Sequence, residues 1–477
     1  MRKTLGAIRQ KLVGQLLGES VFLSFLGLAG AGFLVAGFIP ALNRILRDRL
    51  ALSEAGVFLI LVVGLTLLTG LVSGTGPALF LSSFPPARIL RGTVFPGARD
   101  GTSRLRKILV LFQFAVSIVF LVSVIGVHRQ LEFLRGRNLG YQKENVVTIP
   151  LKGLLRRNGQ VLKQELLRLP QVESVTSASN SLIGVSSSSA IGWEGMSPGQ
   201  KAELAYNWVD YDFLKTLGLE LAEGRFFSPE AATDLKDAFV VNEAAVRAMG
   251  LQAPLGKEII RSPNSPYEDR GRIIGVLKDF HYESLRSEIR PFCLIPTLSG
   301  GDMVVRLRPG PPAETLKKIE QTIRSLSPGH PFDVRFLDED IDELYRTDRT
   351  TQTLIFMVAL VALWLSGLGL YGLAAFSTER RTREIGIRKA VGASAGRIAL
   401  LLSKEFAVLA AVAGLVAGPV SWVIVGKWLR NFAYHVDPQL WMFLAAGGVV
   451  AFTIGITVAR SVVKASRTNP AQSLRRE

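Results

Sequence analysis

Cysteine and histidine are scarce in this sequence. Cys293 is the only cysteine among 477 residues, so no disulfide can form within the chain and any water-exposed domain must be held together by its core. We assign Cys293 no role, because a lone cysteine usually behaves as a small buried apolar residue. Only four histidines are present, and they form no cluster with metal-ligand spacing. No metal site is therefore expected.

A nucleotide-binding phosphate loop is also missing. This motif requires a glycine, four intervening residues and then Gly-Lys-Ser/Thr. The pair Gly256-Lys257 is followed by Glu258, and Leu251 stands where the first glycine should be. The chain is therefore predicted to be no enzyme and to bind no cofactor, and any energy from ATP must come from a partner subunit.

Charge is absent from several long stretches, for example residues 57–81 and 108–127. A hydrocarbon core about 30 Å thick needs roughly 20 apolar helical residues to cross it. Six segments qualify: residues 13–37, 56–81, 107–127, 353–376, 404–426 and 440–459. The first of them starts too late and runs too long for a cleaved signal peptide. The sequence predicts a polytopic α-helical membrane protein with six transmembrane helices.

The net charge of +17 fits this topology. A basic balance can indicate nucleic-acid binding. Here, however, 22 Lys and Arg residues lie in or beside the segments on one side of the predicted spans, against 5 on the other side. Positive residues collect on the cytoplasmic side of a membrane. We therefore expect a multi-pass protein of the bacterial cytoplasmic (inner) membrane, surrounded by membrane lipid, with both termini cytoplasmic and no nucleic-acid partner.

Residues 128–352 are too polar to cross a membrane, and by this topology they form an extracytoplasmic domain. Short β-branched stretches predict strands at residues 172–177, 238–241, 272–276 and 303–307. Amphipathic stretches predict helices at residues 162–169, 242–249 and 312–326, where Asn242 and Pro312 suit helix starts. An α+β domain is therefore expected.

Two parts of the chain resemble each other. Residues 2–7 match residues 388–393 at an offset of 386, and Glu19 matches Glu405 at the same offset. Residues 86–91 match residues 470–475 at an offset of 384. Two predicted spans lie inside each copy. Such repeats are common in transport proteins, because two similar halves can move against each other.

Two groups of residues have a spacing that could suit a metal ion. Asp279, His281 and Glu283 would share one face of a strand, but we favour a solvated strand end. Asp338, Asp340 and Asp342 have the spacing of a calcium loop without its glycine. We interpret them as the solvent-exposed face of an amphipathic helix. Its apolar stripe is expected to consist of Leu337, Ile341, Leu344 and Tyr345.

Two ionisable residues stand at matching span entrances, Glu19 and Glu405. An ionisable residue inside a membrane is a functional candidate by default. Both lie near the start of an apolar block, where the side chain can also reach the interface. Both interpretations stay open, and interfacial placement is preferred.

Several motifs resemble a known family. Residues 379–394 (ERRTREIGIRKAVGAS) and 469–475 (NPAQSLR) are similar to the cytoplasmic loop and terminal motif of FtsX-like ABC transporter permeases. Residues 209–214, 224–227, 241–245, 254–257 and 274–281 are similar to the MacB-type periplasmic core domain. The resemblance covers nearly the whole chain. It implies six transmembrane helices and one α+β extracytoplasmic domain of MacB periplasmic-core type.

The resemblance also implies a domain organisation. Residues 1–92 would be the C-terminal part of a first FtsX-like repeat with two transmembrane helices, and residues 93–106 a cytoplasmic linker. Residues 107–127 would be a transmembrane helix and residues 128–352 the MacB-like core domain. Residues 353–477 would be a second FtsX-like permease domain with three transmembrane helices. Long members of the family have eight spans and two outer domains, so an N-terminal part would be missing here.

The family implies a partner and a docking surface. Its permeases work with a separate ABC ATPase, whose motion the helices relay to the outer domain. A short amphipathic helix within residues 379–394 would offer charges for orientation and an apolar stripe for a groove. The alternative is an anchor that binds only lipid phosphates. The expected docking residues are Glu384, Ile385, Gly386, Arg388, Lys389, Gly392 and Ala393, with a second surface at Arg2, Lys3, Gly6 and Ala7.

The expected function follows from this resemblance. The chain would be a permease subunit that couples the ATPase to the extracytoplasmic domain for export, efflux or lipoprotein and peptide handling. Further partners would be a second permease, in a homo- or heterodimer, and a periplasmic or outer-membrane protein. The alternative is an FtsX-like membrane scaffold that regulates a cell-wall hydrolase.

Overall fold

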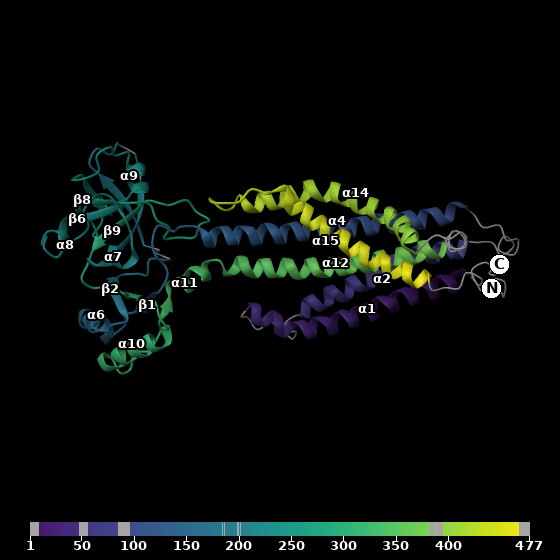
Figure 1. The fold of residues 1–477 in the computed structure, drawn as a ribbon, viewed down its shortest axis with the longest axis horizontal. Helices are drawn as coiled ribbons and strands as arrows, with labels where there is room; N and C mark the ends of the chain where they lie inside the picture. The colour runs from purple at the N-terminus through teal and green to yellow at the C-terminus, as the bar shows by residue number, and fades with distance from the viewer. Residues whose placement is uncertain are drawn as a thin grey trace. The chain divides into compact units, whose positions relative to one another are not determined.

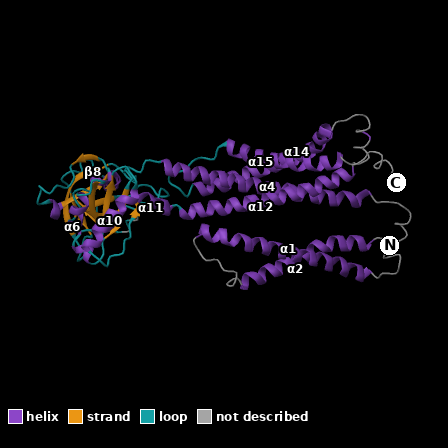
Figure 2. Cartoon of the chain, turned by 60° about the horizontal axis from the view of Figure 1, so that its bottom comes forward, coloured by secondary structure: helices purple, strands orange, loops and turns teal. Residues whose placement is uncertain are grey.

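The computed structural model describes residues 9–46, 56–83, 96–380, 387 and 395–466, except residues 184, 186, 198, 199 and 201. The chain divides into two compact units (Figures 1 and 2). The first comprises residues 1–112 and 375–377, and the second comprises residues 113–374 and 378–477. Each unit is described by itself.

The first unit contains α1 (Arg9–Leu46), α2 (Gly56–Ser83) and the beginning of α4 (Pro96–Gly136). Helices α1 and α2 lie side by side. Two glycines of α2 allow this close approach, because a Cβ on Gly70 would stand 2.8 Å from the Cα of Val21, and one on Gly74 would stand 2.9 Å from Ser20. Small residues serve this purpose widely between membrane helices.

Replacing Gly70 and Gly74 with leucine is expected to separate α1 from α2. The added side chains would overlap the backbone of α1, and overpacking of this kind costs about 1–3 kcal/mol per site. We expect a lower midpoint of thermal unfolding in detergent. The matched control is Gly64→Leu in the same helix, because a Cβ at Gly64 meets nothing within 4 Å. Equal stability of the two variants would contradict the close contact.

The second unit contains the rest of α4 together with α12 (Arg346–Arg380), α14 (Ala395–Leu429) and α15 (Leu440–Ser466). A hydrogen bond of 3.0 Å between the buried hydroxyls of Ser117 and Ser366 joins α4 to α12. Gly126 of α4 faces Val425 of α14, since an added Cβ would stand 2.8 Å from that side chain.

Six helices in the described part of the chain are long and apolar enough to cross a membrane, which confirms the six predicted spans. Two of them extend well past the predicted limits. Helix α4 starts at Pro96, inside the predicted linker, and continues to Gly136, so it measures roughly 60 Å over 41 residues. Helix α12 likewise begins at Arg346, before the predicted start of the span.

Between α4 and α12 lies the α+β domain, residues 137–345. Its strands are β1 (Val146–Pro150), β2 (Val172–Ala178), β3 (Ser188–Trp193), β4 (Ala202–Val209), β5 (Leu221–Gly224), β6 (Ala238–Asn242), β7 (Glu258–Arg261), β8 (Asp269–Leu277), β9 (Phe292–Pro296), β10 (Asp302–Leu307) and β11 (Arg335–Phe336). Its helices are α5 (Leu154–Arg157), α6 (Gly159–Leu167), α7 (Phe213–Leu217), α8 (Asp234–Asp237), α9 (Glu243–Met249), α10 (Pro312–Leu326) and α11 (Leu337–Leu344).

The strands form two lobes. Strands β11, β1, β10 and β2 are antiparallel and make the four-stranded lobe, which α6 and α10 cover. Strands β4, β3, β7, β8, β6 and β9 make the ring lobe, which closes on itself because β9 pairs with both β6 and β4. The lobes meet where Ala178 of β2 pairs with Val209 of β4.

The predicted strands correspond to β2, β6, β8 and β10, and the predicted helices to α6, α9 and α10. Asn242 caps α9 by accepting a hydrogen bond of 3.0 Å from the backbone N–H of Ala245, and Pro312 is at the start of α10. Cys293 is buried in the core of the ring lobe, as expected for a lone cysteine.

Candidate functional site

The predicted docking residues lie outside the described part of the chain. This holds for Glu384, Ile385, Gly386, Arg388, Lys389, Gly392 and Ala393, and also for Arg2, Lys3, Gly6 and Ala7. Within this loop Ile387 is described, and 51% of its surface is exposed. Glu19 is exposed on α1 in the first unit, whereas Glu405 is half-buried on α14 in the second.

A different site stands out in the second unit, where membrane helices meet the α+β domain. We call it the junction. It consists of the end of α4 with the residue after it (residues 130–137), the segment 279–290 of the α+β domain, the start of α12 with the residue before it (residues 345–348) and the α14–α15 loop (residues 430–439). One buried cluster joins these segments, since it contains Leu131 and Leu134 of α4, Phe280 and Phe292 of the domain, and Phe432 of the loop.

Gln130 ties the α14–α15 loop to α4. Its side chain is fully buried, its amide donates to the carbonyl of Tyr434 at 2.8 Å, and its amide oxygen accepts from the N–H of Val436 at 2.9 Å. The loop is thereby held at two backbone groups by one side chain. Buried backbone groups need such partners, because leaving them unpaired costs free energy comparable to a lost hydrogen bond.

Arg286 joins the α+β domain to both neighbouring segments. Its guanidinium forms an ion pair with Asp348 of α12, whose carboxylate is buried, and lies 4.9 Å from the ring centre of Phe432. Its carbonyl accepts a hydrogen bond of 2.9 Å from the N–H of Ala433. One residue before it, the N–H of Leu285 donates to the hydroxyl of Tyr345 at 2.9 Å. A displacement of α12 or of the loop must therefore act on segment 284–286.

Residues 279–283 are not the solvated strand end that we favoured from the sequence. Strand β8 ends at Leu277, and 7% of His281 and 2% of Tyr282 are exposed. Asp279 accepts from the N–H of Ala244 at 2.8 Å and pairs with Arg247 at 2.5 Å. The prediction was wrong because neighbouring segments cover this stretch. Among the described residues, no three His, Cys, Asp or Glu side chains lie close enough to hold a metal ion.

The second acidic cluster lies on α11, as predicted. Asp338 and Asp342 are exposed and Asp340 is half-buried, while Leu337 and Tyr345 are buried. Leu344 departs from the expected apolar stripe, since 39% of it is exposed.

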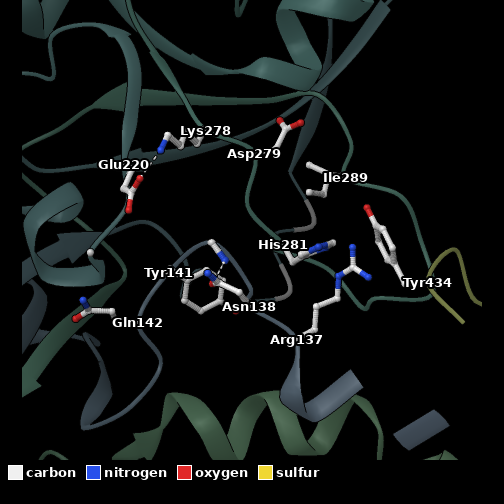
Figure 3. A pocket seen from close by; sticks show the side chains of 12 residues that line it. Arg137, Asn138, Tyr141, Gln142, Glu220, Lys278, Asp279, His281, Ile289 and Tyr434 are labelled. Atoms are coloured by element: carbon white, nitrogen blue, oxygen red, sulfur yellow. Dashed lines mark hydrogen bonds and ion pairs between the residues drawn. The ribbon is translucent and has the colours of Figure 1, made fainter. Parts of the chain in front are cut away.

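A polar cavity of about 550 Å³ adjoins the junction (Figure 3). The guanidinium of Arg137 lies over the ring of Tyr434, with its Cζ 3.8 Å from the ring centre, and His281 lines the same cavity. The ring of His281 meets that of Tyr434 edge-on, with the ring centres 5.1 Å apart. Lys278 and Glu220 form an ion pair of 2.6 Å on another side of the cavity.

His281 is held in its neutral form. Burial lowers the pKa of the imidazole from 6.5 to about 4, and the positive charge of Arg137 acts in the same direction, while Asp279 opposes them. The folded chain thus binds a proton at His281 less readily than the unfolded chain does. The resulting stabilisation is fully present above pH 6.5 and is lost as the pH falls from 6.5 towards 4.

Acidification is therefore expected to loosen the junction. Between pH 7 and pH 4 His281 contributes a loss of up to about 3 kcal/mol, since one pKa unit corresponds to about 1.4 kcal/mol. Thermal unfolding followed at several pH values measures this loss. His281→Phe keeps an aromatic ring against Tyr434 but cannot titrate, so its stability should fall less over the same range. A pH dependence identical to that of the wild type would contradict the assignment.

Sequence reasoning did not identify the junction. Gln130 and Arg286 belong to no motif. For residues 430–439 the sequence predicts only a short loop between two spans. One signal was available: the loop contains Phe432 and Tyr434, and two aromatic residues in a ten-residue loop suggest a packed surface.

Comparison with known protein families assigns both parts of the second unit. Residues 108–324 match the MacB-like periplasmic core domain, and residues 356–470 match the FtsX-like permease C-terminal domain. The first match covers most of α4 and the α+β domain as far as α10, and the second covers most of α12 together with α14 and α15.

Curated relatives agree with these matches. The macrolide export ATP-binding/permease protein MacB of Vibrio parahaemolyticus is 25% identical over 403 residues, which are 78% of this chain and 58% of that protein. MacB of Escherichia coli K12 is 26% identical over 304 residues, 58% of this chain and 46% of that protein. The chain thus spans less than two thirds of the length of these relatives.

Among solved structures, the periplasmic region of MacB from Actinobacillus actinomycetemcomitans is similar over 42% of this chain and 93% of that one, with 17% identity and a TM-score of 0.32. The chain therefore carries a MacB-like periplasmic core domain followed by an FtsX-like permease C-terminal domain.

Proposed function

We propose that this chain transmits motion from a separate ABC ATPase to its α+β domain. The observation that carries the proposal is the junction, where segment 279–290 contacts α4 and the α14–α15 loop through a common core and α12 through an ion pair. The side chain of Arg286 contacts both α12, at Asp348, and the α14–α15 loop, at Phe432. Helices that move at their far ends would therefore act on the domain as levers, because packed interfaces have discrete arrangements and do not deform continuously.

The orientation belongs to this proposal. The excess of Lys and Arg on one side places both termini in the cytoplasm and the α+β domain outside. The loop between α12 and α14 then faces the ATPase. Exposure of Ile387 agrees with a docking surface, because an apolar side chain at 51% exposure is available to a partner groove.

The work done by the domain is proposed to be export, efflux or the handling of a lipoprotein or peptide. The printed names of the curated relatives include macrolide export, which makes export the first class to test. The same relatives combine ATP-binding and permease functions in their names. A partner ATPase would supply the first of these functions to the present chain.

The ATPase contact can be tested by charge reversal. Glu384→Lys combined with Arg388→Glu is expected to abolish co-purification with the partner ABC ATPase, because each reversed charge would then face a like charge on the partner. Membrane insertion should be unaffected. Lys427→Glu combined with Arg430→Glu, at the opposite end of α14, is the matched control and should retain the partner. Unchanged co-purification of the first variant would overturn the docking site.

A further inference from the structure

Two adjoining cavities lie between α4 and α12 in the second unit. The first, of about 560 Å³, is also bordered by Trp441 at the start of α15. The second, of about 430 Å³, continues along α4 and α12 towards the α+β domain. Both are lined by His128, Gln352 and Thr353, so they form one depression, which we call the interfacial groove.

The two ends of the interfacial groove differ in chemistry. One end is lined by Val124, Ile125, Phe356 and Trp441. Phe356 and Trp441 are 46% and 42% exposed, so they are available to a ligand. Such a surface suits a hydrocarbon chain, because the removal of apolar surface from water is favourable.

The other end of the interfacial groove is basic. It is lined by Arg135, Arg349 and Glu132, whereas Arg129 lines the first cavity, with its guanidinium 5.8 Å from the ring centre of Trp441. Glu132 pairs with Arg129 at 3.0 Å, whereas Asp342 of α11 pairs with Arg349 and lies 3.9 Å from Arg135.

The interfacial groove as a whole carries a net positive charge. The three guanidinium groups of Arg129, Arg135 and Arg349 face the two carboxylates of Glu132 and Asp342. An anionic group with several oxygens would complement this charge.

The change from apolar to basic occurs at the expected membrane boundary. Residues 108–127 of α4 contain no charge, and His128 and Arg129 follow at once. The side-chain amide of Gln352 donates a hydrogen bond of 3.1 Å to Nδ1 of His128 across the groove. Trp441 lies at the same level, and tryptophan prefers the interface between hydrocarbon and water. The apolar end thus lies at the depth of acyl chains and the basic end at the depth of headgroups.

We propose that the interfacial groove binds one glycerophospholipid with an anionic headgroup, taken from the leaflet on the side of the α+β domain. An acyl chain occupies the apolar end beside Phe356 and Trp441. The phosphate occupies the basic end, where Arg129 and Arg349 donate to it. The bound lipid spans the gap between α4 and α12, so it stabilises these two helices against separation just below the junction.

The lipid can be mapped by photolabelling of the full chain in phosphatidylcholine vesicles. The probes are a phosphatidylglycerol and a diacylglycerol that carry the same photoreactive acyl chain. In the wild type, phosphatidylglycerol should label residues 124–129 and 352–356 more strongly than other lipid-facing residues. Ile125→Trp fills the apolar end and should lower labelling by both probes at least about fivefold, the effect of roughly 1 kcal/mol. Val361→Trp, on an exposed part of α12 outside the groove, should leave labelling unchanged.

The headgroup is tested separately by Arg129→Gln, which alters an exposed side chain and should leave folding intact. It should lower labelling by phosphatidylglycerol about fivefold or more and leave labelling by diacylglycerol unchanged. Labelling spread evenly along the lipid-facing helices would overturn the proposal. So would competition by inorganic phosphate, which would indicate a free-anion site, or cross-links between two chains at residues 124–129, which would indicate a second copy in the groove.

Discussion

Replacing Gln130 with leucine is expected to release the α14–α15 loop from α4. Leucine has a similar volume and helix propensity, so α4 should persist. The carbonyl of Tyr434 and the N–H of Val436 would, however, lose the buried side chain that now satisfies both of them. Both hydrogen bonds are partly buried, and each such bond contributes about 0.5–1.5 kcal/mol, so the combined loss should be at most about 3 kcal/mol.

Hydrogen exchange measures this release directly. A loss of about 3 kcal/mol predicts roughly hundredfold faster exchange of the amides in residues 430–439, provided that they exchange by local opening. Gln439→Leu is the matched control, since Gln439 is exposed in the same loop and its side chain accepts a hydrogen bond from the indole N–H of Trp441. Equal exchange rates in Gln130→Leu and the wild type would show that the loop is held by other contacts.

Coupling should fail in the same variant if the junction transmits motion. The ATPase would still bind at the other end of the helices and hydrolyse ATP. The α+β domain would no longer move with the helices, because the loop that bonds to it through the N–H of Ala433 would no longer be fixed to α4. Substrate export that persists at the wild-type rate while loop exchange is accelerated would count against the proposed function and leave the structural prediction intact.

Asp210→Ala is expected to have the largest effect on the stability of the α+β domain. Only 2% of Asp210 is exposed, at the point where the two lobes meet. Its carboxylate pairs with Lys163 at 2.7 Å and accepts from the N–H of Ser177 at 2.8 Å and from the hydroxyl of Thr176. These three partners belong to α6 and β2, so the side chain fastens the end of β4 to the four-stranded lobe.

Removing Asp210 leaves a largely buried cation behind. Burial disfavours the charged form of Lys163, but the carboxylates of Asp210 and Asp212 outweigh it and raise the pKa of that amine. Breaking a buried pair on one side costs about 3–5 kcal/mol. Urea unfolding followed by tryptophan fluorescence would measure the loss, because Trp208 lies on β4 beside the lobe boundary.

Asp212→Ala provides the control for this measurement. Asp212 binds the same amine at 2.6 Å, but 48% of its side chain is exposed. Exposed ion pairs contribute about 1 kcal/mol or less. A loss in Asp210→Ala no larger than that in Asp212→Ala would mean that Asp210 does not fasten the lobes.

The sequence by itself determined the membrane spans and many elements of the α+β domain. Hydropathy over about 20 residues and alternation within a strand are local properties, so they hold whatever the rest of the chain does. For this reason the six spans, strands β2, β6, β8 and β10, and the amphipathic helix α11 could be predicted. The family resemblance came from motifs of the same local kind.

Only the tertiary structure decided which segments meet at the junction. Gln130 and Tyr434 are 304 residues apart, and the sequence around neither residue indicates that the two are in contact. The pattern of residues 279–283 likewise predicts an exposed end, because periodicity reports which face a side chain occupies but not which distant segment covers it. Here the end of α4, the start of α12 and the α14–α15 loop cover that stretch, and packing among them turns a polar sequence into a buried site.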